Sequence, residues 1–236
     1  MTAMDILPKD LKQVVVFQHC TDDDLHLILK NSIPRSIEEG GFFFMQGDEA
    51  DYLYVLTSGQ VKLMQSNPNG QQVNLRTIYP WQMFGALGAV RTDGAPYPAS
   101  AQTLDDSTAL AVPSLFLRSM LDTRPYLSFG LMNLMTSYIQ EMQSRYRELA
   151  TERVEQRVAN ALIRLAGQAG IKSEKEAGIE LSLSRQDVAE MTGTTLYTVS
   201  RLLSEWERRG IIKTGRERIA VLQPHDLVRI AEGFEK

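Results

Sequence analysis

The amino-acid sequence predicts an α+β fold in three parts: an N-terminal β-roll, a long helix and a C-terminal winged helix-turn-helix. The first part contains many short strand-like runs separated by glycine and turn residues. A heptad-spaced apolar pattern follows, and the last part combines short helical patterns with a pair of strands. We place these parts in residues 1–124, 125–150 and 151–236, with a hinge near Ala150–Thr151.

The N-terminal part begins with a helix and continues with strands. The helix is expected over Asp22–Asn31, with Thr21 as its N-cap, because a threonine hydroxyl can accept from the first free amide groups of a helix. Turn pairs such as Gly40-Gly41 and Ser58-Gly59 separate the clearest strand candidates, which are Phe42–Met45, Tyr52–Leu56, Val61–Met64 and Val73–Ile78. Short strands at this spacing indicate a β-barrel or a double-sheet roll.

The long helix is predicted from about Pro125 to Leu149 by apolar residues at alternating steps of three and four. This pattern is typical of two helices that pack side by side. Its members are Met132, Met135, Ile139, Met142, Tyr146 and Leu149. Two interpretations remain at this point: the stripe packs against a second copy of the chain, or it packs against the chain's own β-domain.

The C-terminal part starts with a helix near Glu152–Gln168 and continues with the winged helix-turn-helix over Ser184–Leu222. Its first short helix, Arg185–Met191, ends at Gly193. Ser184 caps this helix, with an aspartate three residues later that resembles a capping box. A second helix starts after Thr195, which is its expected N-cap.

The second helix leaves one face free for contacts. Its apolar residues follow a helical period and are Leu196, Val199, Leu202, Leu203 and Trp206. Gly210 ends the helix, and the strands Ile211–Thr214 and Ile219–Leu222 flank the basic turn Gly215–Arg218. A helix of this kind places its first turns in the major groove of double-stranded DNA, where side chains reach base edges.

The charge distribution is compatible with a nucleic-acid partner. The formal net charge is −4. Residues 1–150 hold 11 basic and 16 acidic residues, whereas residues 151–236 hold 14 basic and 13 acidic ones. Within the second part, residues 194–219 hold six basic and three acidic residues. Since the local rather than the total charge marks a nucleic-acid surface, we expect a modest basic footprint with few phosphate contacts.

Several classes of protein are disfavoured. The single Cys20 excludes an intramolecular disulfide framework and a cysteine-ligated iron–sulfur cluster. No apolar run approaches the roughly 18 residues of a membrane span, and the first residues lack the pattern of a secretion signal, so we expect a cytoplasmic protein without a membrane partner. An enzyme is disfavoured because His19, His26 and His225 are scattered and no phosphate loop or metal-ligand spacing occurs.

The ordered motifs resemble the Crp/Fnr superfamily of bacterial transcription regulators. Gln46-Gly47-Asp48 and Ser58-Gly59-Gln60-Val61-Lys62 look like its β-roll signature, and Phe84-Gly85-Ala86-Leu87 lies where Phe-Gly-Glu-Leu is usual. The resemblance covers roughly residues 10–225. It implies a cyclic-nucleotide-binding-like, effector-sensing roll, a dimerisation helix, and a DNA-binding domain that recruits or blocks RNA polymerase. We therefore favour a homodimer, since near-palindromic operators need paired readers.

Departures from the family pattern bear on the effector. Ala86 replaces the glutamate that holds a ribose hydroxyl, and Tyr97-Pro98 falls where cyclic-AMP-binding members have Arg-Ser. A cyclic nucleotide would lose its charged partner, so we expect an effector other than cyclic AMP. The resemblance places the pocket at Leu75, Phe84, Gly85, Ala86, Leu87, Tyr97, Pro98, Ala99 and Met142.

Such an apolar pocket suits a haem, an aromatic molecule, a fatty or keto acid, or no ligand. The alternatives are a haem-based sensor of nitric oxide or carbon monoxide and a constitutive DNA binder. A haem needs an axial ligand, for which His19, Cys20 and His26 are the candidates, although such residues are more often surface or cap residues. An effector would act by a population shift, altering packing near Met142 and reorienting the DNA-binding parts at the hinge.

The resemblance also assigns the DNA contacts. The base-reading positions are Leu196, Tyr197, Ser200 and Arg201; a bidentate pair from Arg201 to guanine is the main specific contact, and Leu196 packs on a thymine methyl group. Phosphates are expected at the capped helix ends, Ser184 and Thr195, and at Arg185, Lys213, Arg216 and Arg218. A module whose helix-turn-helix contacts protein, or a DNA-free adaptor, is disfavoured by Arg201 and the basic turn. The loop Gly170–Gly178 resembles the place where activating members touch polymerase.

Overall fold

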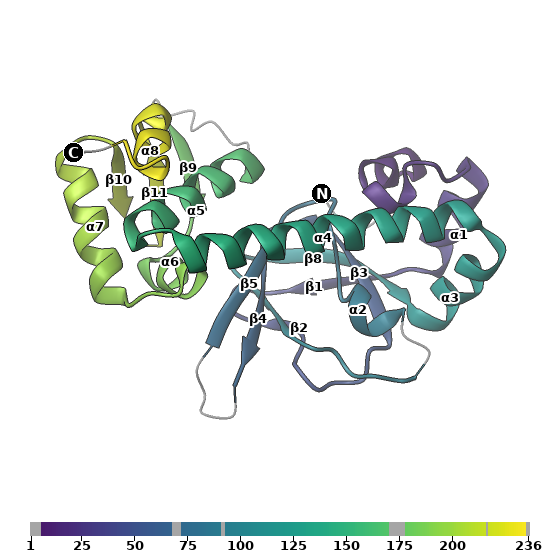
Figure 1. Ribbon diagram of the computed structural model, residues 1–236. Helices are drawn as coiled ribbons and strands as arrows, with labels where there is room; N and C mark the ends of the chain where they lie inside the picture. The colour runs from purple at the N-terminus through teal and green to yellow at the C-terminus, as the bar shows by residue number, and fades with distance from the viewer. Residues whose placement is uncertain (1–5, 68–71, 91–92, 170–177, 216, 235–236) are drawn as a thin grey trace. The chain divides into compact units, whose positions relative to one another are not determined.

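The computed structural model describes residues 6–67, 72–90, 93–169, 178–215 and 217–234. The chain divides into two compact units, residues 1–141 and 142–236 (Figure 1). Each unit has its own core. The predicted α+β class, with a β-roll, a long helix and a winged helix-turn-helix, is confirmed.

The first unit opens with the 3₁₀ helices η1 (Pro8–Gln13) and η2 (Val15–Phe17), followed by α1 (Asp22–Asn31). Thr21 caps α1 as predicted: its Oγ1 accepts from the Asp24 amide at 3.2 Å. In return the Asp24 carboxylate accepts from the Thr21 amide at 3.2 Å. This reciprocal pair is a capping box and fixes where α1 begins.

The β-roll consists of two four-stranded antiparallel sheets with the orders β1-β8-β3-β6 and β2-β7-β4-β5 (Figure 1). The strands are β1 (Ile33–Ile37), β2 (Phe42–Phe44), β3 (Tyr52–Ser58), β4 (Val61–Ser66), β5 (Gln72–Ile78), β6 (Met83–Phe84), β7 (Ser100–Thr103) and β8 (Ser107–Pro113). The four predicted strands are confirmed, and α2 (Ala86–Ala89) follows β6. The sequence pattern did not reveal β8, because this strand lies between β1 and β3 and has almost no exposed residue to break its apolar run.

Alternate residues of β3 enter two different cores. Leu53 and Val55 join a core with the N-terminal helices, whereas Tyr54 and Leu56 join a core with residues of the second sheet. Side chains of a strand point alternately to its two faces, so both faces of this sheet are buried. The first sheet therefore links the roll's interior to the helices that cover it.

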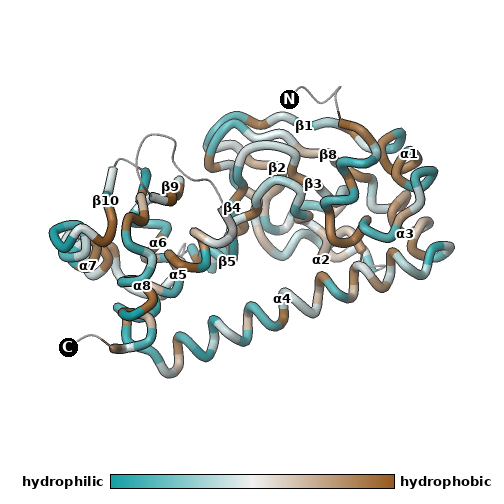
Figure 2. Tube along the Cα trace, turned by 90° about the horizontal axis from the view of Figure 1, so that it is seen from above, coloured by the Kyte–Doolittle hydropathy of each residue, from teal (hydrophilic) through white to brown (hydrophobic). Residues whose placement is uncertain are grey.

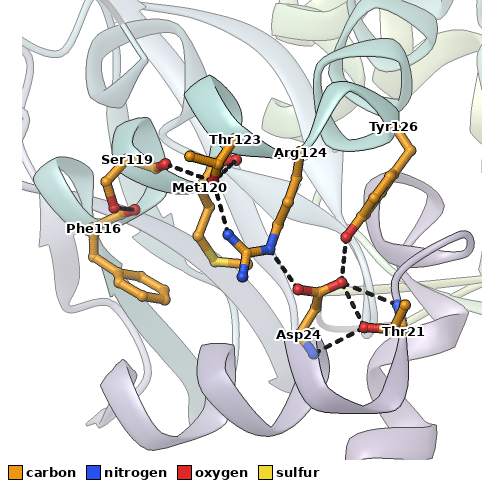
Figure 3. Close-up of polar contacts among 8 residues, drawn as sticks. All are labelled: Thr21, Asp24, Phe116, Ser119, Met120, Thr123, Arg124 and Tyr126. Carbon is orange, nitrogen blue, oxygen red and sulfur yellow. Dashed lines mark hydrogen bonds and ion pairs between the residues drawn. The ribbon is translucent and has the colours of Figure 1, made fainter.

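Two helices complete the first unit, α3 (Ser114–Thr123) and α4 (Pro125–Thr151), of which α4 continues into the second unit. Figure 3 shows how the start of α4 is attached to α1: the guanidinium of Arg124 and the hydroxyl of Tyr126 both donate to the carboxylate of Asp24. None of the described helices has the apolar length that a bilayer crossing requires.

The second unit is the winged helix-turn-helix. Its sheet has the order β10-β11-β9, so the predicted strand pair gains a third strand that the sequence did not indicate. Its elements are α5 (Val154–Ala169), β9 (Ile179–Ser182), α6 (Arg185–Thr192), α7 (Leu196–Arg208), β10 (Ile212–Gly215), β11 (Arg218–Val221) and α8 (Pro224–Ala231). Trp206 of α7 is the largest fully buried side chain in the described ranges.

Candidate functional site

The turn between α6 and α7 is fixed by hydrogen bonds at the end of each helix. Ser184 Oγ accepts from the Asp187 amide at 3.1 Å, and the Asp187 carboxylate accepts from the Ser184 amide at 3.0 Å. Gly193 ends α6 with a φ of 61°, a conformation that residues with a side chain rarely adopt, and its amide donates to the Ala189 carbonyl. Thr195 Oγ1 then accepts from the Thr198 amide at 3.2 Å and starts α7. All three predicted helix-end residues are confirmed in these structural roles.

One face of α7 belongs to the core of the unit. Its buried residues are Val199, Leu202, Leu203 and Trp206. Leu196, which the apolar pattern grouped with them, is instead 47% exposed, because it occupies the first turn before the buried face begins. This exposure leaves Leu196 accessible for the base contact that the resemblance assigns to it.

The opposite face of α7 carries a row of exposed polar side chains. Tyr197 is 80% exposed, Arg201 is exposed, and Ser200 beside them is half-buried. Ser204 and Arg208 are also exposed and continue the row, because steps of four, three and four residues keep side chains on one line along a helix. We call Tyr197, Arg201, Ser204 and Arg208 the α7 row. Its last two members were not predicted as site residues, although their spacing from Arg201 was a sufficient signal.

A half-buried carboxylate connects α7 with the strand hairpin. Glu207 Oε1 accepts from the Thr214 amide at 2.7 Å, and its Oε2 accepts from Thr214 Oγ1 at 2.8 Å. These two bonds lower the pKa of Glu207, and the bond from the Thr214 amide has the larger effect. Arg185 Nη2 donates to the same Thr214 Oγ1 at 3.1 Å. Arg185, predicted as a phosphate contact, thus also connects α6 with the hairpin.

The hairpin of β10 and β11 turns tightly, with Gly215 paired opposite Arg218. Glu217 has a φ of 55°, which suits a two-residue turn between antiparallel strands. Lys213 and Arg218 are exposed, and Arg218 Nη1 lies 3.2 Å from Glu180 Oε1 on β9. Arg216, the remaining predicted phosphate contact, lies outside the described residues.

Aromatic side chains fill the region between the two sheets of the roll. Phe44 and Tyr97 stack with ring centroids 3.7 Å apart, and Tyr54 stacks on Phe84 at 5.1 Å. The Tyr97 hydroxyl donates to the Tyr52 carbonyl at 2.5 Å, and burial raises the pKa of this phenol. Position 97, where the resemblance to cyclic-AMP-binding members would place an arginine, thus holds a buried neutral ring rather than a cation.

The other predicted pocket residues are distributed among several environments. Gly85, with a φ of 78°, lies against the stack, since an added Cβ would be 3.2 Å from Tyr97 Cε1 and 3.3 Å from Phe44 Cε1. Ala86 and Ala99 are buried. The remaining four are exposed, so the structure does not gather the predicted set into one buried lining; they are Leu75, Leu87, Pro98 and Met142.

The heptad stripe of α4 is largely exposed. Figure 2 shows hydrophobic stretches recurring between hydrophilic ones along this helix. The exposed fractions are 53% for Met132, 57% for Ile139, 70% for Met142, 75% for Tyr146 and 52% for Leu149, while Met135 is half-buried. An apolar row of this extent on a single helix marks an interaction surface.

The three candidate haem ligands lie near α1. Cys20 is buried, and burial, followed by the charge of Asp24, raises the pKa of its thiol to about 12. The thiol therefore stays protonated, whereas a metal ligand must be a thiolate. His19 and His26 are exposed, and His26 Nδ1 lies 2.7 Å from the Asp22 carbonyl oxygen. Within the described ranges no cluster of three or more histidine, cysteine or acidic residues is arranged to hold a metal ion.

Comparisons with known proteins agree with this architecture. The model of the cyclic nucleotide-binding domain family matches residues 34–124, and that of the Crp-like helix-turn-helix domain matches residues 156–230. The CRP-like cAMP-activated global transcriptional regulator of Mycobacterium tuberculosis is 26% identical over 221 residues, covering 94% of this chain and 98% of that protein. The transcriptional activator protein anr of Pseudomonas aeruginosa is 26% identical over 211 residues, covering 89% and 84%.

A similar fold is found among solved structures. That of FixK2 from Bradyrhizobium japonicum has a TM-score of 0.74 at 20% sequence identity, covering 84% of this chain and 96% of that one. The two family matches lie in the order that the motifs predicted, with the long helix α4 between them. The chain therefore belongs to the Crp/Fnr family of DNA-binding transcription regulators.

Proposed function

We propose that the protein is a homodimeric regulator that reads a near-palindromic DNA site with α7 and is controlled by an effector other than cyclic AMP in its β-roll. The observation that carries the DNA-reading part is the α7 row. Its exposed side chains lie opposite a fully buried face, so the helix presents them without disturbing the core. Two arginines in this row supply donors for guanine and for phosphate.

The base contacts are assigned within the first turns of α7. Arg201 is exposed and extends from the middle of the row, where its guanidinium can bind the O6 and N7 atoms of guanine. Leu196 and Tyr197 are the exposed apolar neighbours, and they favour contacts with thymine methyl groups over a hydrogen bond to cytosine. Ser200 completes the set of base-reading positions.

The test is selection of bound sites from random duplex DNA by the wild type and by Arg201→Ala. The variant should lose about 1–3 kcal/mol on the preferred site and relax one base position in each half-site. Arg229→Ala, which removes an exposed arginine on α8, is the matched control and should keep the full preference. An unchanged preference in Arg201→Ala would contradict the assignment.

Phosphate contacts surround the base-reading helix. The capped starts of α6 and α7, at Ser184 and Thr195, present backbone amides that suit an anion. The cationic partners are Arg185, Lys213, Arg216 and Arg218. These contacts are expected to strengthen binding to all sequences alike and to weaken with salt.

The long helix and the β-roll are proposed to provide dimerisation and effector control. The exposed apolar stripe of α4 supports a homodimer, because a second copy offers the same stripe in return. The aromatic stack at Tyr97 and the absence of the glutamate at Ala86 support an effector other than cyclic AMP, since neither side chain can bind a ribose hydroxyl or a cyclic phosphate charge. RNA polymerase is the expected protein partner, and the loop Gly170–Gly178 proposed for it lies, up to residue 177, outside the described residues.

A further inference from the structure

Arg76 of β5 is held against α4 in an unusual way. Its Cζ lies 4.1 Å from the ring centroid of Tyr138, and its Nη2 lies 3.9 Å from Glu141 Oε2. Tyr138 is itself fixed, since its hydroxyl donates to the Met83 carbonyl at 3.2 Å. The side chain of Arg76 is 18% exposed and that of Glu141 is 23% exposed. The guanidinium is therefore a positioned cation between the roll and the long helix.

Part of the hydrogen-bonding capacity of this cation is not used. Nε and Nη1 of Arg76 are buried, and neither has a partner among the residues that the structure describes. The 3.9 Å ion pair with Glu141 exceeds hydrogen-bond distance, so it supplies charge without satisfying a donor. Two residues earlier on the same strand, Asn74 is 2% exposed, and its Oδ1 is also without a partner in the described part of the chain. Proteins rarely leave several such atoms unsatisfied in one place without a functional reason.

We propose that Arg76 is the binding site for a small organic anion, which is held through a carboxylate or phosphate group and is the effector of this regulator. The planar fork of a guanidinium matches two oxygens of either group, and the contact with the ring of Tyr138 holds this guanidinium in place. The assignment rests on the proposed function.

The site suggests how the anion acts on the regulator. Its charge competes with the carboxylate of Glu141 for the same guanidinium, so binding loosens the 3.9 Å pair that connects β5 with α4. Glu141 lies on α4 between Ile139 and Met142, two members of the exposed apolar stripe. An anion at Arg76 acts by a population shift when the arrangement of α4 without the Arg76–Glu141 pair binds it more tightly than the arrangement with the pair.

The experiment measures thermal unfolding of the full chain with sodium pyruvate, succinate, benzoate, phosphate or cyclic AMP, each against sodium chloride at equal ionic strength. At least one organic anion should raise the Tm of the wild type by about 3–6 °C at ten times its Kd. A shift by phosphate alone would assign inorganic phosphate, and a shift by cyclic AMP alone would overturn the effector class.

Arg76→Met should abolish the shift. In chloride alone its Tm should equal or exceed that of the wild type, because the variant removes a largely buried, poorly paired charge and keeps an unbranched apolar stem. Arg35→Met is the matched control, since Arg35 also lies over an aromatic ring, 5.8 Å from the centroid of Tyr52, but is exposed. It should respond to the anion as the wild type does.

Arg76→Lys provides a second test of anion binding if the methionine variant does not fold. It keeps the charge but not the fork, and should weaken the anion at least tenfold. Equal shifts in the wild type and the Arg76 variants, or no shift with any anion, would overturn the assignment. DNA binding without any anion tests the proposed function separately: a protein that binds DNA but responds to no anion loses this assignment alone.

Discussion

Asp24 is an ionised carboxylate inside the core, where its residue is 5% exposed. Burial alone would raise its pKa, but hydrogen bonds from Tyr126, Arg124 and Thr21 outweigh burial and hold the pKa well below its ordinary value (Figure 3). The hydrogen bond to Asp24, followed by burial and the charge of Asp24, raises the pKa of Tyr126 to about 12. The cluster joins two segments about 100 residues apart in the sequence.

At the residue scale we predict that Asp24→Asn lowers the free energy of unfolding at pH 7 by about 3 kcal/mol, because it leaves Arg124 without its counter-charge. Since the pKa of Asp24 is depressed in the folded state, its contribution is present above about pH 4 and is lost as the pH falls below it. Urea unfolding from pH 7 to pH 2.5 measures both effects. Asp22→Asn, which removes an exposed carboxylate on the same helix, should change stability far less, and an equal loss in the two variants would contradict the argument.

Sequence reasoning reached part of this cluster and part of the DNA-reading face. Thr21 and Ser184 were predictable as helix caps because their partners lie three residues away. Arg124 and Tyr126 were not, since nothing local marks a partner on another helix. Tyr97 was predicted as a pocket residue, but the sequence could not show that Phe44, more than 50 residues away, stacks on it.

Helix packing at the element scale depends on a glycine in α4. A Cβ on Gly130 would lie 2.8 Å from the carbonyl oxygen of Val16 and 3.0 Å from its Cα, so α4 and η2 are in close backbone contact. Gly167 in α5 is the opposite case, because a Cβ there would meet nothing within 4 Å. Substituting alanine at these two glycines therefore distinguishes the cost of a backbone clash, at Gly130, from the gain in helix propensity, at Gly167.

We predict that Gly130→Ala destabilises the protein by about 1–3 kcal/mol, because backbone atoms cannot move aside as a side chain can. Gly167→Ala should stabilise it by up to about 1 kcal/mol, the ordinary gain of alanine over glycine in a helix. Chemical denaturation of both variants provides the measurement. Stabilisation by Gly130→Ala would mean that α4 and η2 do not touch in solution.

The hairpin is positioned relative to α7 by Glu207. We predict that Glu207→Gln lowers the free energy of unfolding by about 1 kcal/mol, since the amide nitrogen that replaces one carboxylate oxygen cannot accept the bond which that oxygen receives from Thr214. Because the pKa of Glu207 is lowered by these bonds, the greater stability of the wild type should be lost as the pH drops below about 4.

The DNA affinity of Glu207→Gln should fall by a similar factor on all sequences, with base preference kept. Glu205→Gln on the same helix is the control, and a changed base preference in Glu207→Gln would show that this residue contributes to readout.

At the scale of the whole molecule, the order of parts was readable from the sequence because each part has its own period. Strand-like alternation, the heptad repeat and the helix-turn-helix pattern are local signals. The third strand of the C-terminal sheet was not readable, because β9 is four residues long and pairs with β11 almost 40 residues later. The use of the α4 stripe is also not decided by pattern alone, since exposure leaves open which partner covers it.

The homodimer can be tested through the centre of that stripe. We predict that Ile139→Glu converts the dimer to monomer, because a second copy would bury this charge against its own apolar row. Sedimentation equilibrium should then give the mass of one chain, 26.6 kDa, where the wild type gives twice that value.

Loss of the paired DNA-binding units should weaken binding to a near-palindromic site by at least a hundredfold, while a single half-site is bound as before. Gln140→Glu adds the same charge one residue further on, away from the stripe, and should leave both mass and affinity unchanged. A dimeric Ile139→Glu with normal DNA binding would show that the stripe packs elsewhere.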